Sequence, residues 1–277
     1  MSETASAFVP AHVTAFFSVH RHEDPTRAGS RGAGITLSDG VTTRVEPTDE
    51  TRILLDGEVV DIPPVARVLD AVDVTARVDI EADLPMGSGF GVSGAAALGT
   101  ALAANRTAER GYTENELIRT AHVAEVEAGT GLGDVVAQAR GGAPIRLEPG
   151  APGYGELDGV PETARIEYVS FGDLPTAEVI SGETASLSAA GESALDALRE
   201  EPTLPRLFAL GHEFAREADL LVPEVAAAIE AVADAGGAAT MAMLGRTVVA
   251  LDSGLSDAGY DATACRVYSG GGTLPEQ

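Results

Sequence analysis

The sequence predicts an α+β fold, with β-hairpins in the first part of the chain, helices after them and a second group of strands near the end. Turn residues separate β-rich runs over residues 35–60, which is the pattern of consecutive hairpins. Helical patterns begin at residue 92 and dominate from there. A doubly wound sheet would alternate strands and helices from the start, so the α+β class fits the sequence better.

The first sixty residues are expected to be mainly β-structure. Residues 5–19 predict two short strands interrupted near Pro10. Residues 20–34 are polar and end in a glycine-rich run, which predicts a connecting or ligand-binding loop. Hairpin turns are expected at residues 38–40 and at residues 56–57, where Asp-Gly pairs occur.

The middle of the chain is expected to be helical around one strand. Residues 74–82 alternate apolar and polar side chains and predict a half-buried strand. Thr113 and Glu116 form a capping-box pattern at the start of a helix. The expected helices are 63–72, 92–110, 113–128 and 134–140, followed by a strand at 143–147.

A stretch rich in proline and glycine, residues 148–159, predicts a domain boundary. The expected domains are residues 1–150 and residues 151–277. In the second domain the expected strands are 165–171, 238–243, 247–251 and 262–268, and the expected helices are 186–200, 203–219, 223–235 and 254–259.

The charge composition is strongly acidic, with 43 Asp and Glu against 18 basic residues and a net charge of −25. All the basic residues are Arg, and this absence of Lys together with the acid excess predicts adaptation to high intracellular salt, which screens the repulsion between carboxylates. No basic stripe is present, so nucleic-acid partners are not expected.

Other features of the sequence predict a cytoplasmic protein without a membrane partner. Cys265 is the only cysteine, which excludes an internal disulfide. The first residues lack the basic and apolar regions of a signal peptide. No apolar run reaches 18 residues.

The stretch 85–98 contains four glycines within eight positions, between a predicted strand and a predicted helix. Main-chain N–H groups at such a helix start favour an anion, above all phosphate. Three interpretations remain open: a structural turn, a dinucleotide fingerprint at residues 89–94, and a kinase phosphate loop. A Walker loop is excluded because no Lys follows the glycines.

A second group of polar residues lies on the helix 113–128 and just after it. Helical spacing places His122 and Glu125 on one face. Asp134 follows a glycine loop at the start of the next helix, where it is a candidate general base or an ordinary helix cap. Glu125 is a candidate Mg²⁺ ligand or a solvated helix carboxylate.

These two stretches together resemble the GHMP kinases. The pattern P-x-x-x-G-x-G-x-S-[GA]-A-A is carried by Pro85, Gly89, Gly91, Ser93, Gly94 and Ala95. The family's later order of a Glu, a glycine loop, an Asp and a Gly-Gly strand is matched by Glu125, Asp134 and residues 141–142. Within the family, residues 10–17, 29–34, 129–138 and 241–245 are most similar to the archaeal pantoate kinases.

The resemblance implies a fold, a reaction and a set of roles. The implied fold joins a ribosomal-S5-domain-2-like domain to a ferredoxin-like domain. The implied reaction is ATP- and Mg²⁺-dependent phosphorylation of (R)-pantoate to (R)-4-phosphopantoate, in coenzyme A biosynthesis, by an enzyme that is often a homodimer. Asp134 would accept the proton of the attacking hydroxyl, and Ser93 and Glu125 would hold Mg²⁺. The residues implied to bind the ATP phosphates are Pro85, Gly87, Ser88, Gly89, Gly91, Ser93 and Gly94, and those implied to bind the substrate are Ser30, His122 and Arg146.

The chain also departs from the family pattern. The basic residue that often stands in the first motif is missing, and only His12 lies near its place. The third motif is reduced to residues 236–237 and Gly245. The open alternatives are a GHMP kinase for homoserine, shikimate or mevalonate, a dinucleotide-dependent oxidoreductase, and a catalytically inactive sensor of the GHMP fold.

Overall fold

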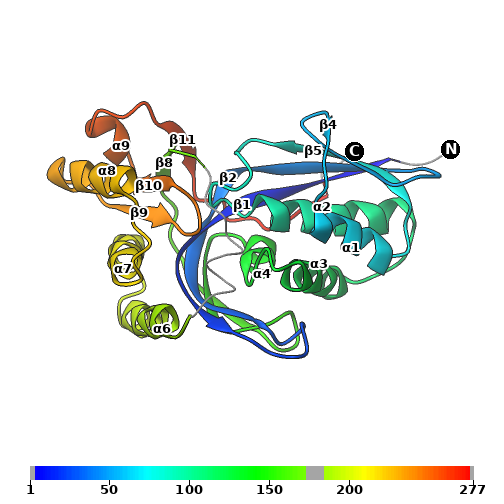
Figure 1. Ribbon diagram of the computed structural model, residues 1–277, viewed down its shortest axis with the longest axis horizontal. Helices are drawn as coiled ribbons and strands as arrows, with labels where there is room; N and C mark the ends of the chain where they lie inside the picture. Colours follow the sequence, from blue (N-terminus) through cyan, green and yellow to red (C-terminus); the bar gives the residue numbers. More distant parts are fainter. Residues whose placement is uncertain (1–3, 173–183, 275–277) are drawn as a thin grey trace.

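The computed structural model describes residues 4–172 and 184–274 and contains two β-sheets, each with its own helices (Figure 1). The first sheet has seven strands in the order β4-β3-β5-β2-β6-β7, with β1 paired to β2. Its strands are β1 (Ala5–His20), β2 (Gly29–Pro47), β3 (Arg52–Leu55), β4 (Glu58–Val59), β5 (Ala76–Ala82), β6 (Ala143–Glu148) and β7 (Glu156–Val160).

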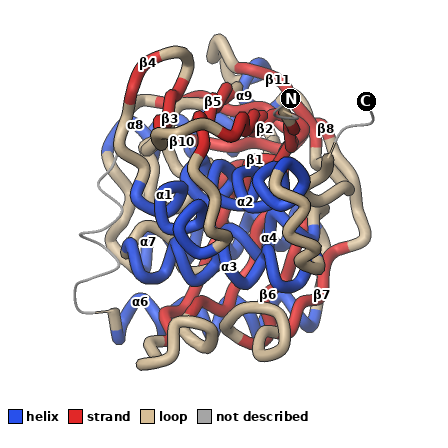
Figure 2. The backbone as a smooth tube through the Cα atoms, turned by 90° about the vertical axis from the view of Figure 1, so that its right-hand side faces the viewer, coloured by secondary structure: helices blue, strands red, loops and turns tan. Residues whose placement is uncertain are grey.

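A helical layer packs beside the long strands β1 and β2 (Figures 1 and 2). It consists of α1 (Pro63–Ala71), α2 (Val92–Thr107), α3 (Glu114–Ala128) and α4 (Asp134–Arg140). Helix α2 lies close to the sheet because its buried face is made of small residues: a Cβ at Gly99 would lie 2.7 Å from the Thr43 hydroxyl on β2. This close packing fixes the N-terminus of α2, where the glycine-rich loop ends.

The second sheet has four strands in the order β11-β8-β10-β9. The strands are β8 (Arg165–Ser170), β9 (Ala239–Ala242), β10 (Thr247–Leu251) and β11 (Thr263–Arg266), and the helices with them are α6 (Ala185–Glu200), α7 (Leu204–Glu217), α8 (Pro223–Asp234) and α9 (Gly254–Asp257). The predicted α+β class is therefore confirmed, as are the capping box of α3 and the hairpin between β3 and β4.

The predictions for the first strands were wrong in two respects. Strand β1 is continuous through Pro10, and the residues around Pro10 and His12 form a register shift that accommodates the missing N–H. Strand β2 contains the glycine-rich end, 29–34, of the expected loop 20–34 and also the expected turn 38–40. Gly40 is opposite Pro10, where a Cβ would collide with the Val9 carbonyl, so this glycine permits a close approach of two strands and not a turn.

Two segments link the halves of the chain. Strand β7 begins within the stretch 148–159 expected as a linker, and it extends the first sheet by pairing with β6. After β11 the chain returns to the first sheet, where Tyr268 N–H donates to the Thr36 carbonyl and Thr273 forms a bridge with Phe8. The division into domains near residue 150 stays a prediction.

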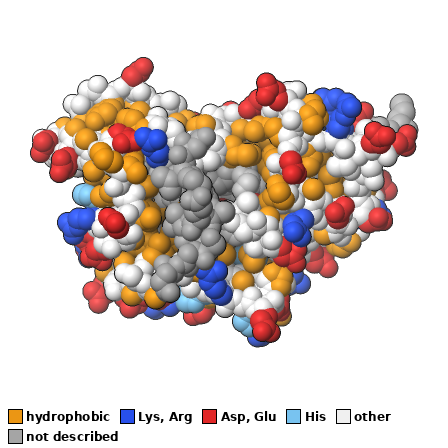
Figure 3. Space-filling model, in the orientation of Figure 1, with side chains coloured by type: hydrophobic (Ala, Val, Ile, Leu, Met, Phe, Trp, Pro, Cys, Tyr) orange, Lys and Arg blue, Asp and Glu red, His pale blue; other side chains and the backbone are white. Residues whose placement is uncertain are grey.

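The surface agrees with the acidic composition. Figure 3 shows Asp and Glu side chains scattered over the visible face, with single Arg residues among them. No helix within residues 4–172 and 184–274 has the length and apolar character needed to cross a membrane.

Candidate active site

A cavity of about 340 Å³ lies where the glycine-rich loop, the start of α4 and the loop between β9 and β10 meet. One wall is formed by Gly87, Gly89, Gly91 and Ser93, and a second by residues 130–134. Ser30 and Arg146 lie in the cavity wall from β2 and β6, and Met243 and Leu244 from the β9–β10 loop. The cavity therefore joins sequence segments that lie far apart in the chain.

The glycine-rich loop takes a conformation that side chains would disfavour. Gly87, Gly89 and Gly91 have φ angles of 85°, 87° and 64°. Gly91 is the N-cap of α2, so the helix N-terminus opens at the cavity and suits an anionic group. The Phe90 carbonyl accepts a hydrogen bond from His12 N–H at 2.9 Å, and the Gly91 carbonyl accepts one from Gln138 at 2.8 Å, so β1 and α4 hold the loop in place.

Three residues predicted to bind phosphate do not line the cavity. Ser88 is buried and absent from the lining. A Cβ at Gly94 would face Gln138 and Val135, so this glycine lets α2 pack on α4. Pro85 is also absent from the lining. Direct phosphate contacts by these three residues stay predictions.

Glu125 is a buried carboxyl group beside Ser93 and Asp134. It is 2% exposed, and burial first, with the Asp134 charge second, raises its pKa to about 8, against hydrogen bonds from Ser93 and Thr130. Its Oε1 has no hydrogen-bond partner among the described residues. A side chain at Gly131 would collide with Oε2, so a small space is kept open between Glu125 and Asp134.

The space at Glu125 fits Mg²⁺. A carboxylate and a hydroxyl supply the hard oxygen ligands that this ion prefers. In the described part of the chain no three His, Cys, Asp or Glu side chains gather into a metal site. A site with only one carboxylate and one hydroxyl from the protein is typical of Mg²⁺, which completes its coordination with substrate phosphates and water.

Asp134 is held in place by His12. The Nδ1 of His12 lies 2.8 Å from Oδ1 of Asp134. Burial would raise the pKa of Asp134, but the hydrogen bond from His12 and the charge of Arg146 outweigh it and hold the pKa below its usual value. Burial lowers the pKa of His12, so the imidazole is neutral and its Nδ1–H donates to the Asp134 carboxylate.

Arg146 is a buried cation with free hydrogen-bonding capacity. It is 2% exposed, and burial lowers its pKa to about 10, although the Asp134 charge favours the protonated form. Its Nε and Nη1 have no partner among the described residues. A Cβ at Gly133 would lie 2.5 Å from the Ser30 hydroxyl and 2.7 Å from Arg146 Nε. These two donors therefore converge over Gly133, which is an arrangement that suits a carboxylate.

His122 is placed differently from the other predicted substrate residues. It is buried, its Nε2 lies 2.9 Å from the Ala28 carbonyl, and it does not line the cavity. Its hydrogen bond supports the start of β2, two residues before Ser30. A direct substrate contact by His122 stays a prediction.

Several cavity residues were missed by the sequence reasoning. His12 had been noted only for its place near the missing basic residue of the first motif, and the structure adds its bond to Asp134, behind the cavity lining. Thr14, Phe17 and Leu132 line the cavity without having been singled out. The β9–β10 loop reaches the glycine-rich loop, because a Cβ at Gly89 would lie 3.0 Å from the Ala242 carbonyl. The only sequence signal for His12, Thr14 and Phe17 was the family similarity of segment 10–17, and strand alternation alone does not say which face of a strand meets a cavity.

A glycine-rich helix start, a buried carboxyl group, a second carboxyl group in the cavity wall and unpartnered Arg146 donors nearby are typical of a phosphoryl-transfer site. The model of the GHMP kinases N terminal domain matches residues 63–142. The pantoate kinase of Thermococcus kodakarensis is 37% identical, over 88% of this chain and 86% of that protein. The pantoate kinase of Methanocaldococcus jannaschii is 32% identical, over 87% and 90%.

A solved structure described as a phosphotransferase related to the CoA biosynthesis pathway superposes with a TM-score of 0.88 at 31% identity, covering 99% of both chains. The chain therefore belongs to the GHMP kinase family of ATP-dependent kinases, and its similarity to pantoate kinases extends over most of its length. The family excludes the dinucleotide interpretation of residues 89–94.

Proposed function

We propose that this protein transfers the γ-phosphoryl group of ATP to the primary hydroxyl of (R)-pantoate and forms (R)-4-phosphopantoate, a step toward coenzyme A. The observation that carries the proposal is the buried Arg146 guanidinium, with two N–H groups unpartnered among the described residues, next to Ser30 and close to Asp134. A hydroxy acid bound through its carboxylate at Arg146 brings its hydroxyl toward the base. The relatives described above carry the same activity in their names.

The apolar part of the cavity wall suits the rest of pantoate. Phe17 and Leu132 line the cavity together with Met243 and Leu244. The two methyl groups of pantoate lie on the carbon between its carboxylate end and its primary alcohol. Apolar side chains bind such a carbon favourably because its burial removes apolar surface from water.

Proton removal in the proposed reaction falls to Asp134. Its lowered pKa keeps it ionised near neutral pH. His12 occupies Oδ1, so Oδ2 is the oxygen that accepts the proton of the substrate hydroxyl. The base thus needs no motif-1 Lys or Arg beside it, because a neutral histidine orients it.

The negative charge of the ATP phosphates would be stabilised by the glycine-rich loop and by the two residues proposed to bind Mg²⁺. Main-chain N–H groups of residues 87–93 would bind the ATP phosphates at the N-terminus of α2. Ser93 and Glu125 would hold Mg²⁺, which when bound neutralises charge on the phosphates. Glu125 must lose its proton to do so, and its raised pKa couples that loss to metal binding.

The proposal also covers the cellular environment of the protein, its domains and its oligomeric state. The acid excess and the absence of Lys support an archaeal, cytoplasmic enzyme adapted to molar salt. We also propose the two domains 1–150 and 151–277 and a homodimer. Size-exclusion chromatography with light scattering in molar KCl tests the dimer directly.

The substrate is tested by a panel of alcohols with ATP and Mg²⁺ in molar KCl. Pantoate, homoserine, shikimate and mevalonate are compared by ADP release and by identification of the phosphorylated product. We expect turnover of pantoate at a kcat/KM far above that of the others. Turnover of another alcohol without turnover of pantoate would overturn the substrate and leave the family unchanged.

A further inference from the structure

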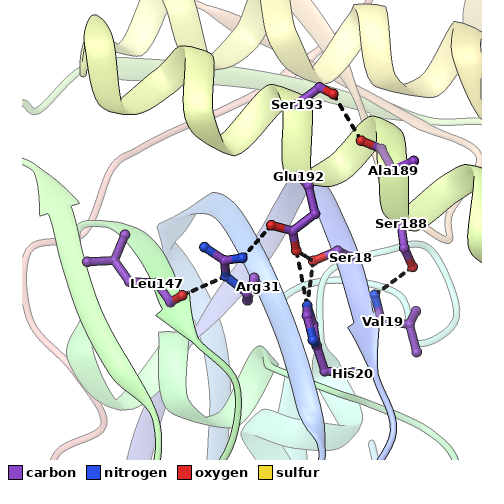
Figure 4. A network of polar contacts seen from close by, with 9 residues as sticks. All are labelled: Ser18, Val19, His20, Arg31, Leu147, Ser188, Ala189, Glu192 and Ser193. Atoms are coloured by element: carbon purple, nitrogen blue, oxygen red, sulfur yellow. Dashed lines mark hydrogen bonds and ion pairs between the residues drawn. The ribbon is translucent and has the colours of Figure 1, made fainter.

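A polar network lies behind the wall of the cavity that contains Ser30 and Arg146. Glu192 on α6 is its centre and accepts hydrogen bonds from three side chains (Figure 4). The Ser18 hydroxyl lies 2.5 Å and His20 Nε2 lies 3.1 Å from Oε1, and Arg31 forms an ion pair with Oε2. Burial would raise the pKa of Glu192, but these donors outweigh it and hold the pKa below its usual value.

The network reaches a third strand through Arg31. The Nε of Arg31 donates to the Leu147 carbonyl on β6 at 2.6 Å, while Nη1 donates to Glu192 (Figure 4). One guanidinium therefore joins β2, β6 and α6. A second contact fixes the same helix, since the Val19 N–H donates to the Ser188 hydroxyl at 3.0 Å.

Three strand residues of this network are each next in the chain to a residue that lines the cavity. Ser18 follows Phe17, Arg31 follows Ser30, and Leu147 follows Arg146. Neighbouring side chains on a strand point to opposite faces of the sheet. Arg31 therefore extends toward α6 while Ser30 extends toward the cavity, and the network holds the strand segments that also carry Phe17 and Arg146.

Helix α6 packs directly against the end of β1, without a side chain between the two backbones. A Cβ at Gly191 would collide with the Phe17 carbonyl, so the helix backbone lies directly on β1. Glu192 is the next residue along the helix. The position of α6 is in this way coupled to the position of Phe17 and Ser30, although no atom of Glu192 lines the cavity.

We propose that Glu192 is a positioning residue for the acceptor substrate, acting through Ser18 and Arg31 on Phe17, Ser30 and Arg146. The ATP-binding loop is held by other contacts, from His12 and Gln138. Loss of the Glu192 contacts therefore weakens binding of the acceptor and spares binding of ATP. This inference rests on the proposed function, because it takes Ser30 and Arg146 as the acceptor site.

The test compares Glu192→Ala and Glu192→Gln with Glu200→Gln, which removes the same charge at an exposed position of the same helix. We expect Glu192→Ala to raise the KM for pantoate about fivefold to tenfold, in the range known for residues that act on a site through neighbours. The KM for ATP should change less than twofold. Glu192→Gln keeps one acceptor oxygen and should fall between the parent and Glu192→Ala, while Glu200→Gln should match the parent.

A variant that unfolds cannot decide the matter, so Arg31→Gln and Ser18→Ala are measured as well, with circular dichroism and thermal unfolding as controls. In the double variant Arg31→Gln/Glu192→Ala the two effects on pantoate KM should be less than additive. An unchanged pantoate KM in folded Glu192→Ala, or an equal rise in both KM values, would overturn the proposal. Absence of pantoate turnover in the parent protein would overturn the proposed function instead, and the same KM comparison would then be made with the alcohol that the protein phosphorylates.

Discussion

The Nδ1 of His12 lies 2.8 Å from Oδ1 of Asp134, and the His12 side chain is fully buried whereas that of Asp134 is 25% exposed at the cavity. The main-chain N–H of His12 also donates to the Phe90 carbonyl in the glycine-rich loop. One residue on β1 therefore holds the candidate base through its side chain and the phosphate loop through its backbone. Gly34 on the neighbouring strand leaves room for the ring, since a Cβ there would lie 2.6 Å from Nε2.

Asp134→Asn should lower kcat by about 10²–10⁴-fold, which is the contribution of a positioned general base. The amide cannot accept the proton of the substrate hydroxyl. Steady-state kinetics with pantoate and ATP measure the effect, and the two KM values should change little. A kcat near that of the parent would remove Asp134 from the mechanism.

Replacing His12 tests whether the histidine acts through Asp134. His12→Leu removes the donor and should lower kcat by about 10–100-fold, because the carboxylate loses its fixed orientation. The pKa of Asp134 should rise without this hydrogen bond, so the acidic limb of the pH–rate profile should move to higher pH. His12→Asn offers an amide N–H near the position of Nδ1 and should recover part of the rate.

The control for His12 is a double-variant cycle. In a background of Asp134→Asn, His12→Leu should cost little further activity if the histidine works only by holding the base. Fully additive losses would show instead that His12 supports the fold around β1, and the positioning role would be wrong.

The raised pKa of Glu125 predicts an unusual dependence of stability on pH in the absence of metal. The unfolded group ionises near pH 4.5, whereas the folded group stays protonated until about pH 8. The folded state therefore binds more protons in this range, and metal-free protein loses stability as the pH rises from about 4.5 toward about 8. Glu125→Gln removes this loss, and the gain at pH 8 should be about 2–3 kcal/mol after the cost of burying an amide.

Urea unfolding in EDTA from pH 5 to pH 8 measures this effect. Glu127→Gln, on the exposed face of the same helix, is the matched control and should keep the slope of the parent. Glu125→Gln should also lose its response to added Mg²⁺. An equal pH slope in Glu125→Gln and the parent would contradict the assigned burial of the carboxyl charge.

Local sequence patterns predicted the parts of this fold that are decided locally. The capping box at Thr113 and the Asp-Gly turn at residues 56–57 were found because their chemistry lies within four residues. The wrong predictions of a strand break at Pro10 and a turn at Gly40 have a non-local cause. Strand β1 lies directly against Gly40, so this glycine permits close strand packing, which the local sequence does not reveal.

The candidate site likewise contains residues that the sequence predicted and residues that it did not. Ser93, Glu125 and Asp134 were predicted together from a family pattern, and the structure brings them together. Leu244 and Phe17 could not be assigned to the cavity from sequence, because the β9–β10 loop and the end of β1 reach it only through tertiary packing.

Arg146→Ala should raise the KM for pantoate about 100-fold and leave the KM for ATP nearly unchanged. A carboxylate held by two guanidinium N–H groups loses both charge-assisted hydrogen bonds. The same variant should be at least as stable as the parent in the absence of substrate, because an unpaired buried cation is removed. Arg67→Ala, at an exposed ion pair on α1, is the control; equal effects of Arg146→Ala on both KM values would contradict an acceptor-binding role.

Alanine at Gly133 and alanine at Gly131 test the acceptor site and the metal site separately, because each adds one methyl group next to one of the two sites. Gly133 has a φ of −167°, outside the left-handed region, and a Cβ there would lie 2.5 Å from the Ser30 hydroxyl and 2.7 Å from Arg146 Nε. Gly133→Ala should therefore raise the KM for pantoate at least about tenfold, since displaced donors cost binding energy of this order. Gly131→Ala places its methyl group against Glu125 Oε2 and should instead raise the Mg²⁺ concentration needed for half-maximal rate. Kinetics of both variants as a function of pantoate and of Mg²⁺ decide the matter, because the same pattern in both would mean that the loop 130–134 responds as one unit and that the two sites are not separable.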